Sequence, residues 1–175
     1  MRRAGAALLV LLAVWLAPGS ITSCAADDAD LAKLRTELEQ LRGRLPSQSH
    51  AMMDVGYHFS NLWFAGQHKN WPLAQFYLDE TRSHLRWAVR IVPVRRTRGG
   101  EVDLRGLLEA VDQSLSDVGR AVAAKNVEAF VAAYKETLEG CYTCHKAADK
   151  PYLRPRIPEQ PKTKIINFDP AATWP

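Results

Sequence analysis

Residues 127–150 read VEAFVAAYKETLEGCYTCHKAADK, and side chains that favour burial recur along them at steps of four and three. This spacing places them on one face of an α-helix. The members of that face are Val127, Val131, Tyr134, Leu138, Cys141 and His145. Asn126 precedes the segment as a favourable N-cap, and Glu128 brings negative charge to the first turn, where the helix dipole favours it. The stretch therefore predicts an amphipathic helix that ends in two cysteines and a histidine.

Three earlier segments have the same helical spacing. They run over residues 47–67, 72–92 and 101–125. Pro72 stands in the first turn of the middle segment, where proline is tolerated, and residues 93–100 (PVRRTRGG) are expected to form a loop because of their paired glycines. No stretch alternates with period two, so no sheet is expected. The chain is predicted to be all-α, with an antiparallel up-down-up-down four-helix bundle over residues 47–150.

In the first two predicted bundle helices, residues of one kind gather on one face. The predicted apolar arc of the first holds Met52, Val55, Gly56, Phe59, Leu62, Trp63 and Gly66. Asp54, Ser60 and Asn61 are expected to point mostly away from this arc. One face of the second helix holds Gln75, Asp79, Arg82, Arg86 and Arg90. We expect a solvated face on which Asp79 pairs with the arginines, a role more common than binding.

Residues 1–23 are predicted to be a lipoprotein export signal. A positive start (MRR) is followed by an apolar run that is too short for a membrane span. Residues 21–24 (ITSC) resemble the lipobox of bacterial lipoproteins, in which the cysteine becomes the lipidated first residue of the mature chain. Cys24 is then a membrane anchor; the alternative is plain cleavage nearby, with a free thiol. Because Ala25 replaces the Asp that retains many such proteins at the inner membrane, we expect the periplasmic side of the outer membrane.

Two segments flank the predicted bundle. Residues 24–46 are expected to form the lipid anchor and a spacer helix. This helix either holds the domain off the membrane, as a spacer or a coiled-coil seam, or packs on the main domain. The leucine stripe of this helix consists of Leu31, Leu34, Leu38, Leu41 and Leu45. Residues 151–175 contain six prolines and are predicted to be an extended tail. The apolar residues of the tail are Ile165, Ile166, Phe168 and Trp174, which favour packing on the bundle surface or on a partner.

The motif Cys141-Tyr142-Thr143-Cys144-His145 suits three kinds of chemistry. A thioredoxin-like redox pair stands at the start of a helix after a strand, whereas this pair comes late in a helix. A zinc site needs more ligands, and only these two of the three cysteines remain once Cys24 is lipidated. Bacterial c-type haem is attached outside the cytoplasm, and the CxxCH spacing lets two thiols meet the two vinyl groups while the imidazole lies beneath the iron. We therefore expect one covalently attached haem c.

The net charge excludes one class of partner. The formal charge of the whole chain is +4, with 23 basic and 19 acidic side chains. Removal of Arg2 and Arg3 with the export signal leaves about +2. No run of basic residues with interleaved aromatics occurs, so no nucleic-acid partner is predicted.

Helix count, helix order and the position of the motif near the end of the fourth bundle helix resemble the cytochrome c′ family and its low-spin four-helix relatives. The resemblance covers roughly residues 47–150. It implies that Cys141 and Cys144 carry the thioether bonds to haem and that His145 is the proximal iron ligand. The leucine stripe and the proline-rich tail depart from the family, so the resemblance assigns them no role.

The sixth iron ligand decides between functions. The family supplies its distal residue from the first bundle helix, where Met52 and Met53 are the only methionines of the mature chain. They lie about 100° apart on a helix, so only one of them faces inward, and Met52 is nearer the centre of the apolar arc. Met52 is thus the candidate distal ligand, with core filling as the alternative. His84, on the apolar face of the second helix, and His58 are competing ligands.

Other side chains are candidates for the haem surroundings. Phe59, Trp63 and Tyr134 are expected to pack around the haem and keep it dry. Arg86 is a candidate partner for a haem propionate.

The expected function is that of a membrane-anchored monohaem cytochrome, a carrier of single electrons and not an enzyme, which exchanges electrons with periplasmic or membrane redox proteins. Bundles of this family often pair, which makes a homodimer a candidate assembly. One alternative is a five-coordinate, c′-type protein that binds NO or CO. A second is a haem subunit or interaction module of a larger redox complex.

Overall fold

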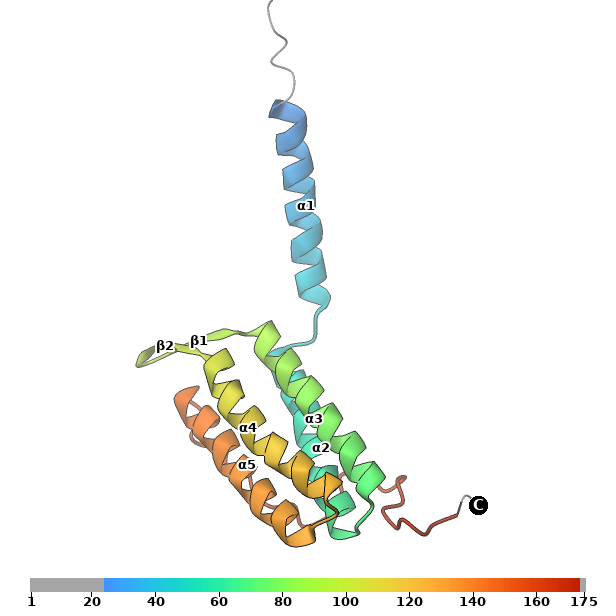
Figure 1. Cartoon of the computed structure of the whole chain (residues 1–175). Coiled ribbons are helices and arrows are strands. Elements are labelled where there is room, and N and C mark those ends of the chain that lie inside the picture. The colour runs from blue at the N-terminus through green and yellow to red at the C-terminus, as the bar shows by residue number, and fades with distance from the viewer. Residues whose placement is uncertain (1–23, 174–175) are drawn as a thin grey trace, which may run out of the picture. The chain divides into compact units, whose positions relative to one another are not determined.

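The computed structural model describes residues 24–173 as a predominantly helical chain (Figure 1), which confirms the predicted helical class. Its elements are α1 (Cys24–Arg44), α2 (Gln48–Gln67), α3 (Trp71–Ile91), β1 (Val94–Thr97), β2 (Gly100–Asp103), α4 (Leu104–Ala123) and α5 (Val127–Ala147). The export signal over residues 1–23 and Trp174 lie outside the described residues. The chain divides between Leu45 and Pro46 into two compact units.

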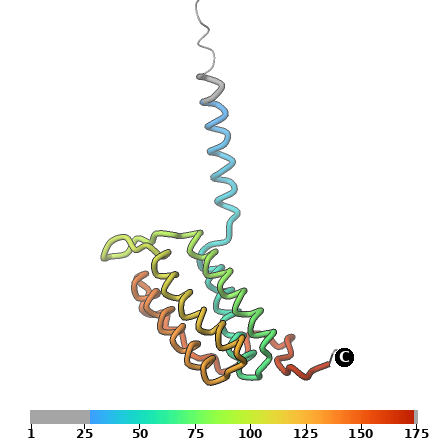
Figure 2. Tube along the Cα trace, viewed as in Figure 1, coloured from blue at the N-terminus to red at the C-terminus, as the bar shows by residue number. Residues whose placement is uncertain are grey.

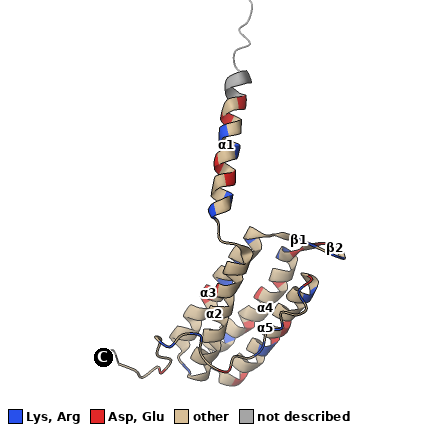
Figure 3. Cartoon of the chain, turned by 180° about the vertical axis from the view of Figure 1, so that it is seen from behind, with Lys and Arg blue, Asp and Glu red and all other residues tan. Residues whose placement is uncertain are grey.

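The first unit contains α1, which forms where the leucine stripe predicts a helix. All five leucines of the stripe are 46–59% exposed, and charges of both signs lie along the helix (Figure 3). Within the described part of the chain, no helix combines the length and the apolar character that a membrane crossing requires.

In the second unit, α2 to α5 pack side by side, and the chain reverses direction at each connection (Figure 2). Contacts join α2 to α3, α3 to α4, α4 to α5, and α2 to α5. The largest apolar side chains buried among them are Leu62, Tyr77, Leu78, Leu115, Val118, Phe130 and Tyr134. Their burial supplies the main favourable contribution to folding.

Side-chain caps set the helix starts of this unit. The oxygens of Ser47, Asn70, Asp103 and Asn126 each accept a hydrogen bond from a backbone N–H in the first turn of α2, α3, α4 and α5. These caps satisfy donors that have no partner within the helix. The predicted cap at Asn126 is therefore confirmed, and its bond to the Ala129 N–H is 3.0 Å long.

The residues predicted as a loop (93–100) and as the start of the third bundle helix (101–103) instead form an antiparallel hairpin of β1 and β2, and the expectation of no sheet was wrong. Arg95 pairs with Val102 and Arg96 with Glu101, around a turn in which Gly100 has a φ of 122°. Only glycine adopts this φ readily. The strands are short, polar and largely exposed, so they lack the apolar alternation by which strands are recognised.

Residues 151–173 contain no helix, as predicted, and pack on the second unit. Phe168 is buried, with its ring 6.3 Å from Tyr77 and 6.1 Å from Phe64. The Lys162 N–H donates to Asn61 Oδ1 at 3.2 Å. Of the two expected resting places for the tail, the surface of its own domain is thus the one observed.

The predicted face of α2 was wrong in part, and the tail explains this for Asn61. Ser60 and Asn61, expected to point away from the apolar arc, are 6% and 0% exposed, whereas Gly56 is exposed. The tail passes beside Asn61 and bonds to its side chain. Periodicity within α2 carries no information about a segment one hundred residues later in the chain.

Two glycines of α2 offer a matched test of this packing. A Cβ at Gly66 would overlap the Phe130 ring, whereas a Cβ at Gly56 would meet no atom. Gly66→Ala is expected to lower the free energy of unfolding by about 1–3 kcal/mol through overpacking. Gly56→Ala is expected to raise it by about 0.5–1 kcal/mol because alanine favours the helix. Urea unfolding measures both; equal effects would contradict the close approach of Phe130 to α2.

Candidate functional site

Cys141, Cys144 and His145 lie in the last two turns of α5, as the sequence predicts. Both thiols are free of disulfide bonds, and all three residues are half-buried. Cys141 packs against the hydrophobic core, as Met52 and Leu138 also do. The motif therefore places two unbonded thiols and an imidazole on one end of a helix, close to the core.

The environment of the thiols disfavours their ionised form. Burial raises the pKa of Cys141 to about 12, and the neighbouring Cys144 adds to this effect. Burial also raises the pKa of Cys144. A redox-active cysteine pair needs a lowered thiol pKa, which a helix N-terminus supplies; the C-terminal end of α5 has the opposite dipole. These thiols thus lack the physical basis of thioredoxin-like exchange.

His145 is oriented by the segment that follows α5. Its Nδ1 lies 2.7 Å from the carbonyl oxygen of Leu153. A carbonyl only accepts hydrogen bonds, so Nδ1 is the donor of this bond. In the tautomer that this bond selects, Nε2 offers its lone pair to a metal while the Leu153 carbonyl holds the ring.

A second contact holds this segment in place. Asp149, just beyond the end of α5, accepts two short bonds from the guanidinium of Arg98 in the hairpin, of 2.7 and 2.9 Å. The hydrogen bonds from Arg98 lower the pKa of Asp149. The hairpin that the sequence did not predict is thus tied to the turn between His145 and Leu153.

Met52 and Met53 differ as expected, because Met52 packs against the core and Met53 is 67% exposed. The Tyr134 hydroxyl of α5 donates to the Phe59 carbonyl oxygen of α2 at 2.9 Å. Met52 precedes Phe59 by seven residues, and Cys141 follows Tyr134 by seven. Because α2 and α5 run in opposite directions, both steps lead about 10 Å toward the same end. Met52 and Cys141 therefore lie at the same level of the two helices.

The three aromatic residues predicted to surround a haem form one cluster between α2 and α5. The rings of Phe59 and Tyr134 are stacked, with centroids 4.2 Å apart, and Trp63 lies 4.9 Å from Tyr134. Burial, followed by the nearby Cys141, raises the pKa of Tyr134 far above its usual range. The cluster therefore adjoins the motif.

The two histidines that compete with Met52 as the distal ligand lie between α2 and α3. His58 on α2 and His84 on α3 contact each other, with ring centroids 4.8 Å apart, and both approach Glu80. In the described residues 24–173, the one group of three metal-ligating side chains is formed by these residues and includes neither cysteine.

Arg86 faces α4, where its Nη2 lies 3.1 Å from Asp112 Oδ2. Arg82 also pairs with Asp112. The expected pairing of this face with Asp79 was wrong, because Asp79 instead accepts a bond from Gln75. Packing of α3 against α4, which periodicity alone does not specify, decides these partners.

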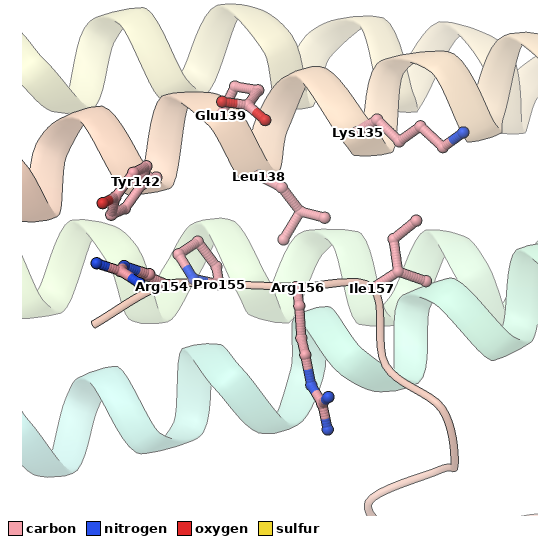
Figure 4. A pocket seen from close by; sticks show the side chains of 8 residues that line it. All are labelled: Lys135, Leu138, Glu139, Tyr142, Arg154, Pro155, Arg156 and Ile157. Carbon is pink, nitrogen blue, oxygen red and sulfur yellow. The ribbon is translucent and has the colours of Figure 1, made fainter. Parts of the chain in front are cut away.

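Sequence reasoning missed the contribution of the tail to this region. The tail returns along α5 and encloses a pocket of about 360 Å³, into which Leu138 points (Figure 4). Its lining residues are Lys135, Leu138, Glu139, Tyr142, Arg154, Pro155, Arg156 and Ile157. No local signal identifies Leu153 or the tail arginines, because their role depends on where the tail lies after folding.

No protein-family model, curated protein or solved structure matches this chain. A functional assignment therefore rests on the residues of the site and their geometry.

The raised thiol pKa predicts a pH dependence for the haem-free chain. An unfolded Cys141 releases its proton near pH 9, whereas the folded thiol keeps it up to about pH 12. The unfolded state therefore binds fewer protons in this window, and stability falls as the pH rises above about 9. Urea unfolding of the haem-free chain at pH 7 and pH 10 measures this loss. Cys141→Ala should lose less stability between the two pH values; an equal loss would contradict a buried, protonated thiol.

Proposed function

We propose that the protein is a membrane-anchored c-type cytochrome that carries single electrons in the periplasm. The observation that carries this proposal is the arrangement of the motif: two unbonded thiols, whose burial raises their pKa, beside an imidazole whose Nδ1 is held by the Leu153 carbonyl. This donor set fits a covalently held haem better than a disulfide or a zinc ion.

Each residue of the motif has a role in this proposal. Cys141 and Cys144 hold the haem through thioether bonds, which carry no charge and no proton and so suit a site that disfavours thiolates. His145 binds the iron through Nε2, while the Leu153 carbonyl fixes the ring and increases its basicity. When bound, haem supplies an iron that gains or loses one electron, and axial ligands and burial set its potential.

The helical unit is proposed to be an antiparallel up-down-up-down four-helix bundle similar to that of the cytochrome c′ family. Support comes from the order of α2 to α5, from the contacts that join each helix to its neighbours, and from the motif in the last turns of α5. Cofactor sites of such bundles are built from side chains on facing helices.

Met52 is the proposed distal ligand. Its level on α2 matches that of Cys141 on α5, and it packs against the same core. The competing His58 and His84 engage each other and Glu80, which favours the methionine. A thioether opposite a histidine raises the reduction potential and suits electron transfer. Phe59, Trp63 and Tyr134 would then exclude water from the neighbouring core.

A second candidate is the binding of NO or CO by a five-coordinate iron. In this candidate Met52 serves as a core filler, the other role that its packing against the core fits. The third reading, in which the tail binds a larger complex, loses support because the tail packs on its own chain through Phe168 and Lys162.

The location is part of the proposal. The lipobox-like ITSC at residues 21–24 supports lipidation of Cys24. More than one acyl chain is needed for stable anchoring, and lipoproteins carry several. Redox proteins of the periplasm or membrane are the proposed partners.

An absorption spectrum of the haem-loaded protein tests the electron-carrier assignment. We expect a low-spin reduced spectrum that does not change on addition of CO, because Met52 fills the sixth position. Met52→Ala should turn high-spin and bind CO, while the adjacent, exposed Met53→Ala should behave as the wild type.

Two results would redirect the assignment. A wild-type spectrum that is high-spin and shifts with CO would replace electron transfer by gas binding. A spectrum that turns high-spin in His84→Ala or His58→Ala, and not in Met52→Ala, would assign the ligand to a histidine.

A further inference from the structure

A cluster of polar side chains joins α2 to α3 apart from the cysteine motif. Glu80 Oε2 lies 4.0 Å from His58 Nε2 and 3.7 Å from His84 Nδ1. Asp54 Oδ2 lies 3.9 Å from His84 Nε2. One ligand atom from each of His58, Glu80 and His84 falls within 4.8 Å of the other two.

Helix geometry explains why these residues meet. Glu80 and His84 are four residues apart on α3, and Asp54 and His58 are four apart on α2, so each pair spans one turn on one helix face. The two helices are antiparallel neighbours. Glu80 therefore faces both histidines, and Asp54 faces the histidine of the opposite helix.

The simplest alternative is a set of histidines whose hydrogen bonds are complete within the protein, and the geometry opposes it. The distances from Glu80 Oε2 and Asp54 Oδ2 to the imidazole nitrogens are too long for hydrogen bonds. His58 Nδ1 is buried without a hydrogen-bond partner. Buried polar atoms are rarely left in this state.

The distances between these carboxylate oxygens and imidazole nitrogens are close to those between the ligand atoms of a metal site. Ligands at 2.0–2.2 Å from a tetrahedral ion are about 3.3 Å apart, so the 4.0 Å contact of Glu80 Oε2 with His58 Nε2 and the 3.9 Å contact of Asp54 Oδ2 with His84 Nε2 need to close by less than about 1 Å. The ring of His84 is already oriented, because its Nδ1 lies 2.8 Å from the Glu80 carbonyl oxygen. Nδ1 therefore carries a proton, and Nε2 is free to bind an ion.

The charges also suit a cation. Glu80 and Asp54 supply negative charge on two sides. Two imidazoles with a carboxylate are typical ligands of zinc and neighbouring transition metals, whereas magnesium and calcium prefer oxygen ligands alone.

We propose that His58, Glu80 and His84 bind a divalent transition-metal ion such as Zn²⁺, with Asp54 as the fourth ligand, in a site separate from the haem motif. The ion would join α2 to α3 and stabilise the folded chain, since a ligand that binds only the folded state raises its stability.

Zinc titration of the full-length, haem-loaded protein tests this site. The protein carries no polyhistidine tag and is first treated with a chelator. Isothermal titration calorimetry is expected to show one Zn²⁺ per chain, and the midpoint of thermal unfolding is expected to rise with zinc. Glu80→Gln and His58→Gln should weaken binding by about tenfold or more. Asp79→Asn is the matched control, because Asp79 neighbours Glu80 in the chain but is exposed and bonds to Gln75.

The haem spectrum, recorded on each variant, separates this site from an iron ligand. Loss of zinc binding in the two cluster variants, with an unchanged spectrum and an unchanged control, supports the proposal. Absence of zinc binding in the wild type, or a zinc affinity that neither substitution lowers, overturns it. A spectrum that turns high-spin in His58→Gln also overturns it, because that histidine would then serve the haem. Circular dichroism confirms that each variant is folded; if Glu80→Gln is not, Asp54→Asn replaces it and should weaken zinc binding in the same way.

Discussion

The contact between Phe59 and Tyr134 sets the register of α2 against α5, and the rest of the site depends on it. The two rings stack at 4.2 Å, and the Tyr134 hydroxyl donates to the Phe59 carbonyl. The hydroxyl is buried, so loss of this bond would leave it unpaired at a cost of about 1–3 kcal/mol. A change of register by one residue would rotate Met52 by about 100° and remove it from the level of Cys141.

The tail connects this register to the chemistry of the motif. Its first residues bring the Leu153 carbonyl to His145, and its later residues bring Lys162 to Asn61 and Phe168 into the core. A segment without helix or strand thus orients the proposed iron ligand and covers α2. Loss of the tail contacts should therefore change the orientation of the His145 ring as well as the packing against α2.

Local interactions account for what the sequence could predict. Helix bounds follow from apolar spacing and from caps such as Asn126, and the inward position of Met52 follows from helical geometry. Haem binding stays a prediction, because it concerns a group outside the polypeptide. The polar hairpin, the burial of Asn61 and the acceptor of His145 all depend on contacts between distant segments. The cluster of His58, Glu80 and His84 likewise needs the register of α2 against α3, which periodicity does not specify.

The central claim is that Cys141 and Cys144 hold a haem covalently. It is tested most directly by the intact mass of the protein after export through a haem-attaching pathway and extraction with acidified acetone. The account predicts that the polypeptide retains the mass and the colour of one haem, and that the double substitution of both cysteines by alanine abolishes both. A wild-type polypeptide that carries its own mass alone, or loses its colour to the solvent, would contradict it.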